Sequence, residues 1–246
     1  MSEIAVRSEK NLVDRVYRST RALILDGTYG PDEPLRLVAL ADQNQVSFIP
    51  VREALRMLEV ERLIIAEPNK GARVAPLSMK SLEDLYLVRK VLESEAVRLA
   101  ARRVDPEFIG QLRSLIGQAV SAIEAGEMES GLALHRKFHF ALYELSGSEW
   151  LCNIIENLWG HSARYVKLAS VQARFVCSID DNHHAIIDCL ERGDAEGAAM
   201  AMNADLGDTI ELLREELAVE VFEVRSGTTS SMSMPDGEMP CSTDGD

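Results

Sequence analysis

The sequence predicts a mainly α-helical protein, with an N-terminal winged helix-turn-helix followed by an antiparallel all-helical bundle. Three observations lead to this prediction: the order of segments in residues 1–76, the helical periodicity of every later segment, and an uneven charge distribution. Residues 1–76 hold 11 Lys and Arg against 11 Asp and Glu, so the remaining residues carry the whole formal charge of −14. The neutral part can still present basic side chains on one face, whereas the acidic part is unsuited to contact with the phosphates of DNA.

The N-terminal part predicts three helices and a hairpin. Apolar residues at helical spacing run over 11–26, residues 29–34 have the composition of a loop, and a short helix ends near Asn44. Ser47 is placed to cap a third helix, which has one apolar face and another carrying Phe48, Arg52 and Arg56 at i, i+4 and i+8. Residues 63–76 then form two short extended runs around a turn. This is the order of a winged helix-turn-helix.

The rest of the chain predicts a helical bundle. We expect helices near residues 79–103, 106–125, 127–146, 149–169, 172–192 and 194–218, separated by Pro and Gly breaks. The expected domains are 1–76, which binds DNA, and 82–218, which binds an effector and metal and dimerises, joined by a linker at 77–81. Residues 226–246 are small, polar and acidic, which predicts a disordered tail.

Composition points to a cytoplasmic protein that does not interact with membranes. No stretch approaches the roughly 20 apolar residues of a membrane span, and the first ten residues carry charges where a signal peptide would be apolar. The four cysteines show no paired spacing, which fits a reducing compartment and argues against a thiolate zinc site.

The third helix supplies the candidate DNA contacts. Such a helix can lie in the major groove, where Arg52 and Arg56 would bind guanine or clamp a phosphate. Lys70 and Arg73 on the hairpin would contact the backbone or minor groove. The alternative is that Arg52 pairs with an acidic neighbour, Glu53 or Glu59, on a solvated helix face.

A motif in the third helix resembles a known family. The run Pro50-Val51-Arg52-Glu53-Ala54-Leu55, preceded by Val46-Ser47 and followed by Leu58-Glu59 and by Lys70-Gly71-Ala72-Arg73-Val74, resembles the GntR family of bacterial regulators over about residues 10–76. The resemblance implies contact with double-stranded operator DNA, and Arg52 carries over as a DNA contact. The full set of candidates is Ser47, Phe48, Arg52, Arg56, Lys70, Gly71 and Arg73. Relatives of the FadR type usually have Arg and Thr where this chain has Phe48 and Ile49. Phe48 either touches a thymine methyl or, as we expect, packs inward.

The histidines all lie in the second half of the chain. His135 and His139 are i, i+4 on one predicted helix, a separation that lets two imidazoles face one ion. Such a pair is also common on helix surfaces and in satisfied cores, so the spacing alone leaves both interpretations open.

Residues 79–218 resemble the FCD domain of the FadR subfamily. The resemblance rests on Leu85-Tyr86-Leu87-Val88-Arg89 with Leu92-Glu93, on Phe138-His139-Phe140-Ala141-Leu142, and on His183, which lies ten residues before Gly193-Asp194. It implies a metal held by His135, His139, His183 and Asp205. His stands where Asp is usual and Asp where His is usual, so three imidazoles and one carboxylate are preserved. This set suits zinc, or else nickel or manganese; the competing interpretation is a degraded site.

The resemblance also implies a function. Arg89 and Arg164 could bind an anionic effector, although Arg89 could equally form an i, i+4 bridge with Glu93. We expect a homodimeric transcriptional regulator, not an enzyme, whose operator affinity is controlled by a small organic acid. The alternatives are an acyl-CoA or other non-metal sensor of the same family, a metal-dependent hydrolase, and a protein-interaction module that has lost DNA binding.

Overall fold

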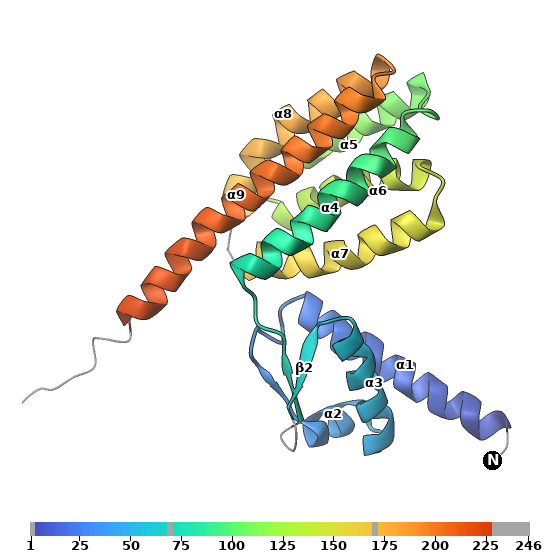
Figure 1. Cartoon of the computed structure of the whole chain (residues 1–246), viewed down its shortest axis with the longest axis vertical. Helices are drawn as coiled ribbons and strands as arrows, with labels where there is room; N and C mark the ends of the chain where they lie inside the picture. The colour runs from blue at the N-terminus through green and yellow to red at the C-terminus, as the bar shows by residue number, and fades with distance from the viewer. Residues whose placement is uncertain (1–2, 68–70, 169–171, 228–246) are drawn as a thin grey trace, which may run out of the picture.

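The computed structural model describes residues 3–67, 71–168 and 172–227, which form two domains (Figure 1). The N-terminal domain holds three helices, α1 (Glu3–Leu25), α2 (Leu37–Asn44) and α3 (Phe48–Val60). Its strands are β1 (Pro34–Leu35), β2 (Ile64–Glu67) and β3 (Gly71–Val74), which form an antiparallel sheet in the order β1-β3-β2. The predicted winged helix-turn-helix is therefore confirmed.

Strand β1 was not predicted, because its two residues are too short to show any periodicity. Pro34 stands opposite Arg73 of β3, and Ile65 of β2 stands opposite the same residue on the other side. The C-terminal end of the loop at residues 29–34 is thus paired with strand β3 of the wing. Packing of α1 against α3 completes the domain, and their apolar faces share one core with the sheet. Its most buried members include Val16, Ile24, Leu40, Val51, Leu58, Leu63 and Val74.

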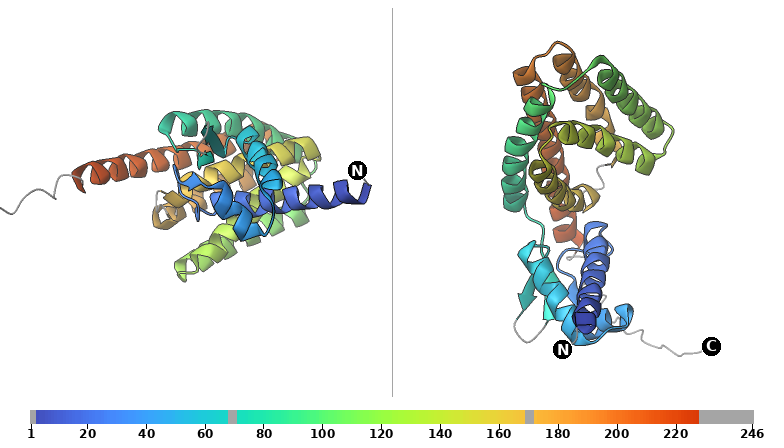
Figure 2. Two further views of the ribbon diagram at one scale, coloured as in Figure 1. Left: turned by 90° about the horizontal axis from the view of Figure 1, so that it is seen from below. Right: turned by 90° about the vertical axis from the view of Figure 1, so that its right-hand side faces the viewer.

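The second domain is the predicted helical bundle. Its described elements are α4 (Met79–Ala100), α5 (Pro106–Glu124), α6 (Met128–Leu145), α7 (Glu149–Leu168), α8 (Gln172–Glu191) and α9 (Ala195–Gly227). Helix α9 packs along both α4 and α8, while α5 packs on α6 and α8 (Figure 2). No helix among the described residues is long and apolar enough to cross a membrane.

One helix boundary matches the expected one and another differs. Helix α4 begins at Met79, as the expected helix near 79–103 does, and the Ser78 side chain caps it by accepting a hydrogen bond from the Ser81 N–H at 3.2 Å. Helix α9 runs to Gly227, past the predicted end at 218 and into the first residues of the predicted tail. The remainder of that tail, 228–246, lies outside the described residues.

Helix α7 of the bundle contacts α1 of the DNA-binding domain (Figure 1). The Arg164 guanidinium donates to the Ala75 carbonyl at 2.6 Å, and Lys167 donates to the carbonyl of Asp26. A Cβ at Gly160 would lie 3.2 Å from Leu25 Cδ1 of α1. Hence α7 touches the first domain at several points along its length.

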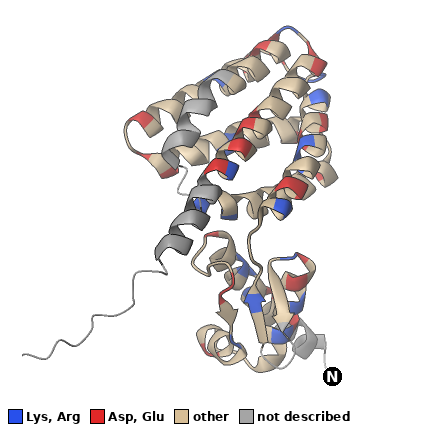
Figure 3. Cartoon of the chain, turned by 60° about the vertical axis from the view of Figure 1, so that its left-hand side comes forward, with Lys and Arg blue, Asp and Glu red and all other residues tan. Residues whose placement is uncertain are grey.

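Charge is distributed differently over the two domains. Acidic side chains follow several helices of the bundle, whereas basic and acidic residues are interspersed on the N-terminal domain (Figure 3). This agrees with the neutral and acidic halves of the sequence. The field around the bundle therefore disfavours contact of that domain with DNA phosphates.

Candidate functional site

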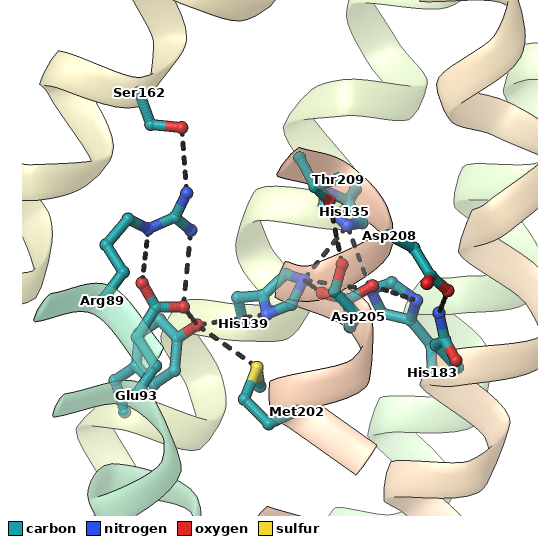
Figure 4. A network of polar contacts seen from close by, with 12 residues as sticks. Arg89, Glu93, His135, His139, Ser162, His183, Met202, Asp205, Asp208 and Thr209 are labelled. Carbon is teal, nitrogen blue, oxygen red and sulfur yellow. Dashed lines mark hydrogen bonds and ion pairs between the residues drawn. The ribbon is translucent and has the colours of Figure 1, made fainter. Parts of the chain in front are cut away.

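Three histidines converge in the interior of the bundle (Figure 4). His135 and His139 come from α6 and His183 comes from α8, and none of them is more than 5% exposed. Their Nε2 atoms form a triangle. The His135–His139 and His135–His183 sides are both 3.0 Å, and the His139–His183 side is 2.9 Å.

This triangle fits a bound cation better than a set of hydrogen bonds. An imidazole nitrogen is a donor when protonated and an acceptor when not, so three such atoms cannot satisfy all three contacts at once. Zinc–nitrogen bonds are about 2.0–2.1 Å long, so nitrogens bound to one ion would lie about 2.8–3.0 Å apart at right angles and about 3.3–3.4 Å apart at tetrahedral angles. The observed sides of the triangle match the right-angle separation.

The protonation state of the cluster also suits a metal. Burial lowers the pKa of His135 well below its usual value, and His183 and Arg89 lower it further. Burial and the neighbouring His135 and His183 do the same to the pKa of His139. Both rings are therefore neutral near pH 7, which is the form that binds a metal.

Asp205 on α9 lies beside the triangle. One carboxylate oxygen is 3.8 Å from His139 Nε2, and the other is 3.7 Å from His183 Nδ1. Burial raises the pKa of Asp205 to about 7, and the negative charge of Glu93 adds to the increase. The structure thus brings the four residues implied by the FCD resemblance together, with Asp205 just outside direct contact. Four donors of this kind suit a borderline divalent ion.

A chain of hydrogen bonds orients His139. The Tyr143 hydroxyl donates to Glu93 Oε2 at 2.5 Å, and its oxygen lies 3.2 Å from His139 Nδ1. Because the single hydroxyl proton is used on Glu93, the oxygen accepts the His139 Nδ1–H. That places the lone pair of His139 on Nε2, directed into the triangle. Carboxylate partners commonly fix ligating histidines in this way.

Arg89 forms the i, i+4 bridge with Glu93 that was one of the two interpretations left open by the sequence. It forms a buried ion pair with Glu93, with Nε 2.6 Å from Oε1, and it donates to Ser162 Oγ at 2.9 Å. Burial opposes its charge, but the Glu93 carboxylate outweighs burial and raises the pKa of Arg89. The guanidinium also lies over the rings of Tyr86 and Trp159 and lines the cavity described next.

A cavity of about 400 Å³ opens beside the histidines. Leu132, Val166 and Leu206 supply apolar wall, while His135, His139 and Asp205 supply one polar end. Arg164, the other predicted effector contact, is not among its lining residues. That guanidinium faces a second hollow between the domains and holds the Ala75 carbonyl instead. The structure therefore does not bring Arg164 to the histidine cluster.

The predicted DNA-contacting residues lie at the start of α3 and on the wing. Ser47 occupies the cap position of α3, although its side chain makes no capping hydrogen bond. Phe48 is 49% exposed, so the expectation that it packs inward is wrong: it lies on the exposed face of α3 with Arg52, whereas the opposite face, which carries Val51, is buried in the core. Arg52 is exposed and takes part in no ion pair within the described part of the chain, whereas Arg56 pairs with Glu53 at 2.8 Å.

On the wing, Gly71 has a φ of +99°, which favours glycine. Arg73 of β3 donates to the Asp32 carbonyl at 2.6 Å, so this side chain helps to hold the wing to the preceding loop. Lys70 lies outside the described residues.

Several residues of the site were not found in the sequence. Tyr143 follows His139 by four residues, so the spacing that linked His135 to His139 extends to it. Trp159 comes from another helix and shows no such signal. Arg21 and Leu25 line the cavity from α1 of the other domain, a placement that only the fold reveals.

Comparison with known families decides the class of this protein. Residues 12–74 match the bacterial regulatory proteins of the gntR family, and residues 84–208 match the FCD domain. The chain belongs to the GntR family. Other GntR regulators bind operator DNA through the first domain and an effector through the FCD domain. This GntR protein is accordingly a transcriptional regulator and not an enzyme, which removes the hydrolase alternative.

Individual relatives agree with this assignment. The protein is 30% identical over 194 residues to the HTH-type transcriptional regulator McbR of Escherichia coli (strain K12), covering 77% of this chain and 87% of McbR. It is 33% identical over 176 residues to the Nta operon transcriptional regulator of Aminobacter aminovorans, covering 71% and 81% of the two chains. The solved structure of E. coli McbR/YncC superposes with a TM-score of 0.68 at 28% identity, covering 84% of this chain and 98% of that one.

Proposed function

We propose that this GntR regulator changes its operator affinity when a small organic acid binds at a divalent metal in the FCD domain. The metal would be held by His135, His139, His183 and Asp205. The observation that carries the proposal is the triangle of buried imidazole Nε2 atoms beside a cavity of about 400 Å³. Zinc is the proposed ion, with nickel and manganese as alternatives.

The cavity supports a small acid as the effector. When bound, the metal supplies a positive centre that attracts a carboxylate. The apolar wall formed by Leu132, Val166 and Leu206 would then cover the carbon skeleton. A volume of about 400 Å³ lies at the small end of ligand pockets, which run from about 300 to 1,000 Å³. An acyl-CoA, with its nucleotide and long pantetheine arm, is too large to be enclosed there.

We propose that the first turn of α3 and the wing contact operator DNA. The supporting observations are the exposure of Phe48 and Arg52 on one side of the helix and the absence of an ion pair for Arg52 among the described residues. An unpaired exposed guanidinium is available for a guanine edge or a phosphate. Ser47, Arg56, Lys70, Gly71 and Arg73 complete the proposed contact set. Retention of this surface disfavours a module that has lost DNA binding.

We also propose that the regulator is a cytoplasmic homodimer of the FadR subfamily. An exposed apolar strip on α4 supports the dimer: Leu87 and Val91 are each 65% exposed, and Val88 is 45% exposed. Covering such a strip with a second copy would remove it from water. A two-fold dimer would read two half-sites of a semi-palindromic operator.

Operator binding under defined metal conditions tests the proposal. An operator is selected from random duplex DNA, and its Kd is measured for zinc-loaded wild-type protein with and without acetate, succinate, glutarate or benzoate. We expect at least one acid to shift the Kd. His139→Ala should abolish that shift, whereas Arg98→Gln, which breaks a surface pair with Glu196 on the bundle, should keep it. An acid response that survives in His139→Ala would refute a metal-dependent effector site.

A further inference from the structure

The proposed effector cavity is not built by the FCD domain alone. Arg21 and Leu25, both on α1 of the DNA-binding domain, line it together with residues of the bundle. Close approach at Gly160 of α7 makes this possible, since a Cβ there would lie 3.2 Å from Leu25 Cδ1 and 3.7 Å from Arg21 Nη2. An occupant of the cavity therefore meets side chains of both domains.

Arg21 also holds the end of the recognition helix. Its Nε lies 2.8 Å from Glu61 Oε2, and Glu61 is the residue that caps the C-terminal end of α3. The Tyr17 hydroxyl, also from α1, donates to the other oxygen of the same carboxylate. Glu61 thus joins α1 to α3, and Arg21 supplies the positive charge in that connection.

The other arginines that line the cavity are engaged within the bundle. Arg89 is paired with the buried Glu93, and Arg136 is paired with Glu156, which lines the same cavity. The Arg21–Glu61 pair is different because its acid lies in the DNA-binding domain. Both partners are also partly exposed, at 27% and 19% of their side-chain surface, so the pair exchanges partners more readily than the buried Arg89–Glu93 pair.

We propose that an anionic effector competes with Glu61 for Arg21. This inference rests on the proposed function, because it takes the occupant of the cavity to be a carboxylate. When Arg21 turns to the effector, Glu61 loses its positive partner and the end of α3 loses one of its connections to α1. Effector binding and the position of the recognition helix are thereby coupled through one side chain. By thermodynamic linkage, if operator DNA favours the Arg21–Glu61 pair, operator binding weakens effector binding by the same factor.

Two substitutions separate the roles of this pair. Effector affinity is measured by calorimetry on full-length, zinc-loaded protein, with acetate, succinate, glutarate and benzoate as probes. Glu61→Gln removes the competitor without touching the cavity, so it should bind the acid about two- to fivefold more tightly. Arg21→Gln removes the guanidinium that would bind the acid, so this variant should bind the acid about tenfold more weakly. Arg98→Gln, which breaks a surface pair with Glu196 on the bundle, is the control and should match wild type.

The outcomes distinguish this inference from the proposed function. The expected pattern is opposite shifts in the two variants, together with loss of the acid-dependent change in operator Kd in Arg21→Gln. Equal acid affinity in wild type and Arg21→Gln would overturn the competition and leave the metal site standing. Weaker or unchanged binding in Glu61→Gln would overturn it as well. If none of the acids bound wild-type protein, both the carboxylate effector and the competition would be overturned.

Discussion

Replacing Tyr143 by Phe should weaken metal binding without removing any metal ligand. The hydroxyl of Tyr143 is fully buried, and it accepts the His139 Nδ1–H while donating to Glu93. The substitution leaves a buried Nδ1–H without this acceptor and frees the ring to place its proton on Nε2. In that tautomer Nε2 has no lone pair for a metal.

The size of the effect follows from the contacts that are lost. Partners of this kind typically change metal affinity by about 10- to 100-fold, which corresponds to about 1.4–2.7 kcal/mol. One buried polar group left without a partner costs about 1–3 kcal/mol in the free energy of unfolding. Because Phe keeps the ring, the variant should still fold, and Glu93 keeps its ion pair with Arg89.

Competition with a chromophoric chelator measures the zinc affinity of the variant. Tyr165→Phe is the matched control, since that buried hydroxyl donates to the Ser78 carbonyl, away from the histidines. We expect the control to lose some stability but to keep its zinc affinity within about twofold. Wild-type zinc affinity in Tyr143→Phe would show that the chain from Glu93 to His139 does not orient the ligand.

Three further predictions concern pH, DNA and packing. The pKa of Asp205 is raised from 3.8 to about 7, so its protonated form stabilises the metal-free protein at low pH, and this stability is lost as the pH rises through about 7. Thermal unfolding should accordingly show a larger gain in Tm from added zinc at pH 8 than at pH 5, and Asp205→Asn should flatten the difference; an equal gain in wild type would contradict this. Arg52→Ala should weaken operator binding by about 1–3 kcal/mol in an anisotropy titration. The control Arg102→Ala, on the exposed end of the bundle, should leave operator binding unchanged. Equal losses of operator-binding free energy in the two variants would indicate a general charge effect. A Cβ at Gly131 of α6 would lie 2.2 Å from the buried Ile123 side chain of α5, so Gly131→Ala should destabilise the protein by about 1–3 kcal/mol in urea unfolding. The control is Gly117→Ala, whose Cβ would meet nothing within 4 Å and which should not destabilise the protein. Unchanged stability of Gly131→Ala would refute close packing of α5 on α6.

Most of the helices were predictable because their breaks are local. Pro106, Gly126 and Gly147 lie at or next to helix ends in both the sequence prediction and the structure. The extent of α9 was underestimated, because residues 219–227 contain no Gly or Pro until the last position. Strand β1 depends on pairing with the distant β3, which a local pattern does not contain.

The candidate site was predictable only in part. Spacing on α6 linked His135 to His139, but the addition of His183 and Asp205 came from the FCD resemblance and not from periodicity. Exposure of Phe48 and the placement of Arg164 on the Ala75 carbonyl depend on how whole helices are set against their neighbours. The approach of Arg21 to the cavity depends on how the two domains pack together. No local sequence pattern predicts that packing.

Elemental analysis of the purified protein tests the central claim most directly. Wild-type protein and His139→Ala are each purified without chelators, dialysed against metal-free buffer and measured for zinc, nickel and manganese, with His161→Ala as the control. The account predicts about one divalent ion per chain in wild type and His161→Ala, and a loss of that ion in His139→Ala. Metal-free wild-type protein that takes up no ion when zinc is supplied, or metal retained in His139→Ala, would contradict it.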